Sequence, residues 1–302
     1  MLADASLSGS LSRGSRRVGF TPWARRRRTM RISLIRLWRP TYPALLTLAC
    51  AYLLAPTIVA MLASVSKTAF LTFPPQGLST KWYQAFFARD DFVRSLVFSL
   101  VLGASVAVVA VLVGVVLAAS IGRRSGVGRS SLTSLSYLPL ILPTIVYGPA
   151  LLIWAAKIHL TDGYWTTLLT LAAAHLILAL PFSLQSIIVG YDGLDPSLEE
   201  AAMVLGARPR HVFRYVTLPL LMPSIIAGAT FAFLTSFDEP IIALFLSRAD
   251  LVTLPVQIYT YLRFKPDPTI AAIATVMILL SLLAVLIADR LVGLGKMMGL
   301  GR

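Results

Sequence analysis

Long apolar runs alternate with short polar connections along most of this chain. Each run carries few charges and is long enough to cross a bilayer as an α-helix, which takes about 20 residues. The runs predict membrane helices at residues 44–65, 92–121, 132–156, 165–189, 218–237 and 269–288. The pattern therefore predicts an all-α membrane protein with six transmembrane helices.

Prolines are expected to disturb the third and fourth of these runs. Pro139, Pro143 and Pro149 lie in the third predicted helix, and Pro181 lies in the fourth. Because proline lacks an N–H and crowds the preceding turn, we expect these helices to bend or break there. A short apolar piece at 241–246 separates the fifth helix from a proline-bearing loop.

Composition supports the membrane assignment, since 57% of the 302 residues are hydrophobic and only 13% are charged. The net charge of +14 is concentrated in residues 1–39, which hold ten Arg and one Asp. A basic segment just before a membrane helix is an orientation signal and contacts anionic lipid, which argues against a nucleic-acid partner. We expect residues 1–39 to form a basic, disordered cytoplasmic tail, with Met30 as an alternative start, and residues 40–302 to form the transmembrane domain.

Candidate chemistry is sparse. The single cysteine, Cys50, excludes a disulfide framework, and His159, His175 and His211 lack metal-ligand spacing. The sequence has no glycine-rich phosphate loop of the Gly-x-x-x-x-Gly-Lys-Ser/Thr type, so we expect no ATP site of that type. We expect no catalytic residue and no metal site, and we interpret His175 and Gln185 as hydrogen-bonding groups between helices.

The longest polar interval of the second half predicts a helix, a turn and a second helix. Asp195 is a suitable N-cap and Pro196 suits the first helical position. This helix is expected to end at Gly206, because glycine tolerates the left-handed conformation that terminates helices. Pro209 is expected to open a second short helix, and Leu218 to begin the next apolar run.

The same interval resembles the signature loop of binding-protein-dependent ABC importer permeases. That loop reads Glu-Ala-Ala, three residues, Gly, nine residues, Ile, any residue, Leu-Pro, and this chain departs from it only by Val216 in place of Ile. The residues assigned to the loop on this basis are Glu199, Glu200, Ala201, Ala202, Gly206, Ala207, Phe213, Val216, Leu218 and Pro219.

The resemblance implies a type I ABC importer permease fold with cytoplasmic coupling helices, in which residues 191–217 form the coupling loop of a permease domain spanning residues 40–302. It implies a dimeric ABC ATPase that binds ATP and Mg, so that this chain needs no cofactor of its own. It also implies a second permease subunit, a periplasmic or extracellular solute-binding protein, and a location in the bacterial inner membrane.

The distribution of basic residues predicts the orientation. If both termini are cytoplasmic, the inner segments hold 19 of the 27 Lys and Arg residues and the outer segments hold eight. Because Lys and Arg are enriched on the cytoplasmic side, this orientation is favoured, and it places the signature loop in the cytoplasm.

Residues 78–83, 236–239 and 254–259 resemble the spermidine/putrescine branch of these permeases, which implies a polyamine solute. Asp238 and Glu239 are candidate substrate-passage residues, because charges beside a membrane helix usually face a polar route. The alternative is that the pair only caps the end of the fifth helix. Related permeases for ferric iron, thiamine and phosphonates share much of the scaffold, so those solutes remain open.

Two other classes of protein are alternatives. A secondary transporter or channel working without ATP would show internal repeats and ionisable residues deep in its helices, and an integral membrane enzyme would show a cluster of His, Asp or Glu at one membrane face. The sequence has no clear repeat, nearly uncharged helix interiors and no such cluster.

Overall fold

The computed structural model describes residues 22–69, 74–122, 127–264 and 267–293, with the backbone alone for residues 22–41. In these ranges it contains helices and two isolated bridges, Ser66–Leu78 and Arg248–Leu251, but no sheet. The elements are α1 (Pro22–Ser64), α2 (Lys81–Phe87), α3 (Asp90–Gly122), α4 (Val127–Ser136), α5 (Leu138–Ile141), α6 (Thr144–Lys157), α7 (Tyr164–Asp192), α8 (Pro196–Val204), α9 (Pro209–Val212), the π-helical segment η1 (Phe213–Thr217), α10 (Leu218–Phe237), α11 (Ile241–Leu246), α12 (Leu254–Phe264) and α13 (Thr269–Val292). The predicted all-α class is confirmed.

The chain divides into two units, Met1–Ile58 and Val59–Arg302, which are described separately. Helix α1 begins at Pro22, so residues 22–39 are helical where their composition predicted disorder. Arg, Leu and Met have high helix propensities, and no proline lies between Pro22 and Pro40, which explains the difference. The rest of the predicted tail, residues 1–21, lies outside the described residues.

Five helical segments within the described ranges are long and apolar enough to cross a membrane. They are Tyr42–Ser64, Asp90–Gly122, Tyr164–Asp192, Pro209–Phe237 and Thr269–Val292. These segments coincide with the first, second, fourth, fifth and sixth predicted helices.

The third predicted helix is divided into α4, α5 and α6. The chain breaks before Pro139 and again before Pro143, where Leu142 takes an extended conformation with φ −79° and ψ 131°. At Pro143 this follows from the clash of the proline ring with the preceding Leu142, which disfavours helical geometry there. The helix continues through Pro149 and Pro181, so the chain does not break at those two prolines.

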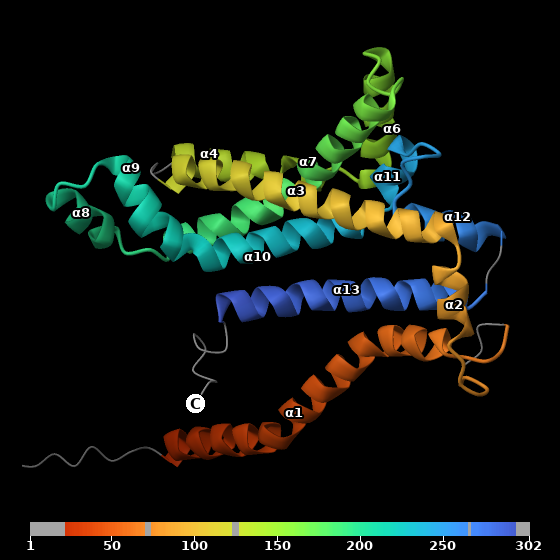
Figure 1. Ribbon diagram of the computed structural model, residues 1–302. Coiled ribbons are helices and arrows are strands. Elements are labelled where there is room, and N and C mark those ends of the chain that lie inside the picture. The colour runs from red at the N-terminus through yellow and green to blue at the C-terminus, as the bar shows by residue number, and fades with distance from the viewer. Residues whose placement is uncertain (1–21, 70–73, 123–126, 265–266, 294–302) are drawn as a thin grey trace, which may run out of the picture. The chain divides into compact units, whose positions relative to one another are not determined.

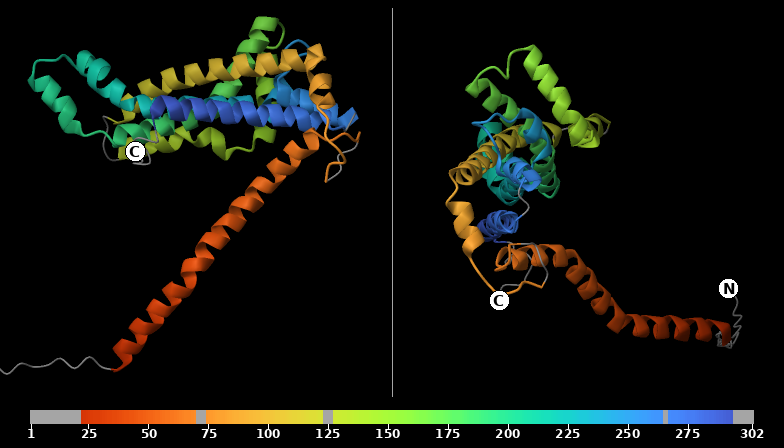
Figure 2. Two further views of the ribbon diagram at one scale, coloured as in Figure 1. Left: turned by 60° about the horizontal axis from the view of Figure 1, so that its bottom comes forward. Right: turned by 90° about the vertical axis from the view of Figure 1, so that its right-hand side faces the viewer.

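Helices α3, α7 and α10 pack against one another and form the centre of the second unit, with α13 beside α10 (Figures 1 and 2). Small residues allow this close approach. A Cβ atom at Gly228 in α10 would lie 3.0 Å from the carbonyl oxygen of Ser183 in α7, so glycine is required for the two backbones to meet.

The polar segments lie at the two ends of this bundle. Helices α8 and α9 form one end, whereas α2, α11 and α12 lie at the other (Figure 1). Helix α10 connects the two ends, and its 20 residues span roughly 30 Å at 1.5 Å per residue.

Candidate functional site

The first helix of the signature loop begins as the sequence predicts. The Oδ1 atom of Asp195 accepts a hydrogen bond of 2.9 Å from the backbone N–H of Ser197, and Pro196 occupies the first helical position. This bond stabilises the charged carboxylate and lowers the pKa of Asp195. Helix α8 therefore has a fixed start outside the membrane-spanning segments.

Gly206 ends this helix through its backbone conformation. Its φ of +86° lies in the left-handed region, and its N–H bonds to the carbonyl of Met203 at 2.9 Å. A Cβ atom at this position would meet nothing within 4 Å, so conformation and not crowding makes glycine necessary here. The predicted role of Gly206 as a helix stop agrees with this geometry.

The second half of the loop differs from the expected separate short helix. Residues 209–237 are continuously helical, because α9 passes through η1 directly into α10. Pro219 has no N–H to donate to the carbonyl of Tyr215, and the wider π-helical turn immediately before it accommodates this missing bond. The short helix expected from Pro209 and the apolar helix expected from Leu218 are therefore one continuous helix with a locally widened turn.

The loop presents one face to solvent and packs the other against η1. Among the ten assigned residues, Glu200, Ala201, Gly206 and Pro219 are exposed, whereas Glu199, Ala202, Ala207, Phe213, Val216 and Leu218 are half-buried. The Oε1 atom of Glu199 accepts a hydrogen bond from the hydroxyl of Thr217, which is completely buried. Two adjacent glutamates therefore have different surroundings.

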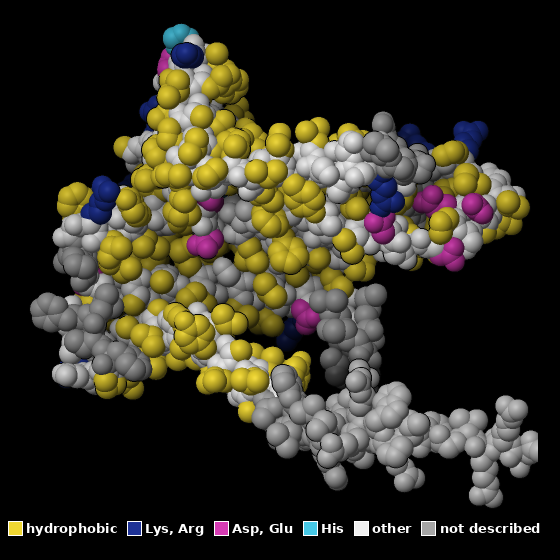
Figure 3. Space-filling model, turned by 180° about the vertical axis from the view of Figure 1, so that it is seen from behind, with side chains coloured by type: hydrophobic (Ala, Val, Ile, Leu, Met, Phe, Trp, Pro, Cys, Tyr) yellow, Lys and Arg dark blue, Asp and Glu magenta, His cyan; other side chains and the backbone are white. Residues whose placement is uncertain are grey.

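Sequence reasoning missed the apolar tip of α8. Val204 and Leu205 are 86% and 88% exposed, and Leu198 and Met203 are also exposed. Figure 3 shows charged side chains gathered at the end of the molecule that carries this loop, whereas hydrophobic side chains cover the bundle. Apolar residues directly before Gly206 were the available signal for an exposed tip.

The two candidate passage residues lie at the opposite end of α10. Glu239 caps the next helix, since its Oε1 accepts hydrogen bonds from the N–H groups of Ile241 and Ile242 at 2.7 and 2.8 Å. Asp238 is exposed, and its carboxylate forms no hydrogen bond or ion pair with any residue in the described ranges, although its backbone N–H bonds to the carbonyl of Leu234. Neighbouring protein atoms nevertheless desolvate its carboxylate in part and raise the pKa of Asp238.

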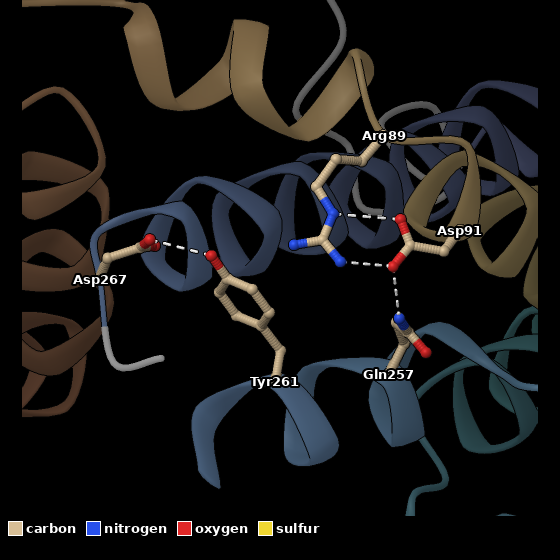
Figure 4. Close-up of polar contacts among 5 residues, drawn as sticks. All are labelled: Arg89, Asp91, Gln257, Tyr261 and Asp267. Carbon is tan, nitrogen blue, oxygen red and sulfur yellow. Dashed lines mark hydrogen bonds and ion pairs between the residues drawn. The ribbon is translucent and has the colours of Figure 1, made fainter. Parts of the chain in front are cut away.

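A polar cluster at the same end fastens α12 to the start of α3 (Figure 4). Arg89 donates to both carboxylate oxygens of Asp91, at 3.1 and 2.5 Å, and the side-chain amide of Gln257 donates to Asp91 at 2.9 Å. The hydrogen bond to Asp91 raises the pKa of the Arg89 guanidinium, which also lies over the ring of Tyr261, 5.0 Å from its centroid.

Tyr261 extends this cluster toward α13. Its hydroxyl donates to Asp267 at 2.9 Å, and burial together with this bond raises the pKa of Tyr261. The phenol is therefore a stable donor at neutral pH. The cluster was not predictable from the sequence, because its members are separated by up to about 180 positions and meet only through the fold.

The predicted polar contact between helices is confirmed for His175. Its Nδ1 lies 2.9 Å from the hydroxyl of Ser236, so that the pair joins α7 to α10 inside the core. Gln185 forms no such bond within the described part of the chain and instead lines a polar pocket beside the ion pair between Arg129 and Asp192.

The described residues form a bundle with five helical segments long and apolar enough to cross a membrane and a helical loop at one end. The fold is similar to a chain of a bacterial ABC transporter involved in the import of the acidic polysaccharide alginate, with a TM-score of 0.65, 16% identity, and coverage of 87% of this chain and 98% of that one. A structure of bacterial alginate ABC transporter in complex with alginate pentasaccharide-bound periplasmic protein gives the same TM-score at 17% identity, covering 85% of this chain and 95% of that one.

Residues 110–294 match the family described as binding-protein-dependent transport system inner membrane component, and this chain belongs to that family. It is therefore a permease of a binding-protein-dependent ABC importer, a multi-pass inner-membrane protein and not an enzyme. ATP is used by a separate ATPase subunit. Membership also rules out the alternatives of a transporter without ATP and of a membrane enzyme.

Several relatives share most of the chain. The spermidine/putrescine transport system permease protein PotC of Escherichia coli K12 is 29% identical over 249 residues, covering 82% of this chain and 92% of the relative. The putrescine transport system permease protein PotI of the same strain is 31% identical over 237 residues, covering 78% and 84%. PotC of Haemophilus influenzae is 28% identical over 240 residues, covering 79% and 91%.

Proposed function

We propose that this chain is one permease half of a polyamine importer, moving spermidine or putrescine into the cytoplasm. The observation that carries this proposal is the similarity to polyamine permeases at 28–31% identity over about four-fifths of the chain. The fold alone does not select the solute, because the similar alginate importer handles an acidic polymer whereas polyamines are cations. Ferric iron, thiamine and phosphonates are the alternative solutes.

In this proposal the chain crosses the membrane six times. Five of the crossings are the five long spans. The remaining one, third in order along the chain, is formed by α5 together with α6, an apolar helix of 14 residues. An even number of crossings places both termini on one side, and the excess of Lys and Arg in the tail and in the signature loop favours the cytoplasm. Helices α2, α11 and α12 then face outward, toward the solute-binding protein.

The signature loop is proposed to be the coupling element that docks on the ATPase dimer. Helix α8 exposes Val204 and Leu205 outside the membrane-spanning segments, where solvent contact of apolar side chains is unfavourable. An apolar tip beside the exposed carboxylate of Glu200 suits a cleft with an apolar floor and a basic rim. ATP and Mg bind the ATPase, whose closure moves this loop, and a second permease subunit completes the passage.

Variants of Glu200 and Gly206 test the coupling role. Gly206→Pro cannot adopt a φ of +86°, and Glu200→Arg reverses the exposed charge. Both variants are expected to insert normally but to copurify with less ATPase and to lose solute-stimulated ATP hydrolysis by on the order of tenfold or more, the loss of about one buried charged contact.

Matched controls test whether the backbone conformation at Gly206 and the charge at Glu200 cause these losses. Gly206→Asn keeps a residue that tolerates the left-handed region, and Glu200→Gln keeps the shape of the side chain. Both controls are expected to retain more ATPase than their partners. Full uptake and full ATPase recovery in Gly206→Pro and Glu200→Arg would show that this loop is not the coupling element.

A further inference from the structure

We infer that the hydrogen bond between Glu199 and Thr217 is the contact that transmits movement of α8 to α10. This inference rests on the proposed coupling role of the loop and assigns the two adjacent glutamates different tasks. Glu200 is exposed for a partner, whereas Glu199 turns inward to the base of α10. Glu199 is thus a positioning residue.

Helix α8 packs one face against η1 and α9, and the hydrogen bond from Thr217 fixes that face to the base of α10. Helix α8 has nine residues, and its C-terminal turn at Gly206 has open space on the side where a Cβ would lie. A displacement of α8 would be absorbed by rotation in this turn unless a second contact resisted it. In the described part of the chain, the Glu199–Thr217 bond is the one side-chain hydrogen bond that connects α8 to the helical run from Pro209 to Phe237.

Thr217 bonds differently from several other helical threonines among the described residues. Thr133, Thr230, Thr235 and Thr275 each donate to the carbonyl four residues earlier in their own helix, at 2.8–3.0 Å. Thr217 instead donates to a carboxylate 18 residues away in another helix. A fully buried hydroxyl requires a partner, and this one takes it from α8.

The position of Thr217 suits transmission. It is the last residue of η1, and α10 begins at the next position. A π-helical turn departs from regular α-helical bonding and is a common place for functional adjustment in a helix. A force carried through Glu199 therefore enters α10 at its base, and α10 reaches the opposite end of the bundle, where Asp238 follows its last residue.

The test compares Thr217→Val with Thr217→Ser in the complete importer. Valine keeps the shape of threonine but removes the donor, whereas serine keeps the hydroxyl. We expect Thr217→Val to retain the ATPase subunit but to raise the ATP hydrolysed per solute transported by about tenfold, the equivalent of one hydrogen bond to a charged group. Thr217→Ser and Glu199→Gln, which keeps an acceptor oxygen, are expected to stay within about threefold of the parent.

A double-mutant cycle identifies the pair as one unit. Glu199→Ala is expected to change the ratio as much as Thr217→Val, and the combination is expected to be no worse than either single change. Three results would each contradict this inference. They are an unchanged ratio of ATP hydrolysed to solute transported in Thr217→Val, additive effects of the two changes in the cycle, and loss of the ATPase subunit from Thr217→Val. Failure of the coupling proposal itself is distinguished by Glu200→Arg, which would then still bind the ATPase.

Discussion

Asp238 and Glu239 are adjacent carboxylates, yet their bonding separates them. The two bonds that Glu239 accepts from the start of α11 satisfy one of its oxygens and explain its presence as a helix cap. Asp238 has no such bond within the described residues, and its partly desolvated carboxylate would be stabilised by a cation. The passage role proposed for the pair therefore falls mainly on Asp238.

This division predicts unequal effects of two conservative changes. Asp238→Asn removes the charge that would attract an ammonium group of the solute. This attraction is stronger than in water by roughly fourfold if the effective dielectric constant falls from ~80 to ~20. Putrescine uptake is expected to fall on the order of tenfold in Asp238→Asn, the loss of one charged hydrogen bond, with assembly unchanged. Glu239→Gln keeps the accepting oxygen and is expected to transport nearly as well as the parent.

Uptake of putrescine by energised vesicles containing each variant measures this difference. Binding of putrescine to the isolated solute-binding protein is the control, because neither change touches that protein. Equal uptake in Asp238→Asn and in the parent would leave Asp238 with no passage role.

Single-residue reasoning succeeds where one residue type has one local use. Asp195 as an N-cap and Gly206 as a left-handed stop follow from local backbone chemistry, and the structure agrees with both. The partner of Thr217 and the cap formed by Glu239 depend on which elements meet and which residues become buried. No spacing in the sequence determines those contacts.

Among the elements, the apolar runs predicted the five long membrane segments, because length and hydrophobicity decide them. Four agree to within a few residues at each end, whereas the fifth begins at Pro209, nine residues before its predicted start. The proline positions were informative but ambiguous. Pro139 and Pro143 break the chain whereas Pro149 and Pro181 do not, since neighbouring helices can accommodate the missing N–H at some sites and not at others. The π-helical turn of η1 was not predicted either, because it too depends on how the structure around Pro219 accommodates the missing N–H.

The cluster around Arg89 is expected to stabilise the attachment of α12. Gln257→Leu removes the bond to Asp91, and Arg89→Ala removes the ion pair and the contact with Tyr261. We expect losses of about 1 kcal/mol for Gln257→Leu and about 2 kcal/mol for Arg89→Ala in the free energy of unfolding, discounted because the ion pair is partly exposed.

Thermal unfolding of the purified complex in detergent measures both changes. Arg263→Ala is the matched control, because Arg263 is an exposed arginine of α12 that bonds to the hydroxyl of Tyr259 one turn earlier in the same helix, so its loss should cost under about 0.5 kcal/mol. A midpoint for Arg89→Ala equal to that of Arg263→Ala would mean that the cluster contributes nothing to stability.

For the molecule as a whole, the fold and the proposed solute rest on different observations. The fold is similar to that of a chain of an alginate importer at 16% identity, so two very different sequences adopt it. The solute depends on a few polar groups and on partner chains, and the relatives that transport polyamines supply the argument for it. Sequence reasoning could therefore reach the class of transporter from one loop, whereas the solute remains a proposal.

We propose that this chain carries a polyamine across the membrane when a partner ATPase acts on the loop containing α8. The most direct measurement uses proteoliposomes containing this chain, the second permease and the ATPase, with ATP inside and the binding protein and labelled putrescine or spermidine outside. We expect uptake that requires ATP and the binding protein and is lost with Glu200→Arg. Import of an anion or ferric iron without polyamine uptake would contradict the solute, and polyamine uptake that persists without ATP would contradict the coupling.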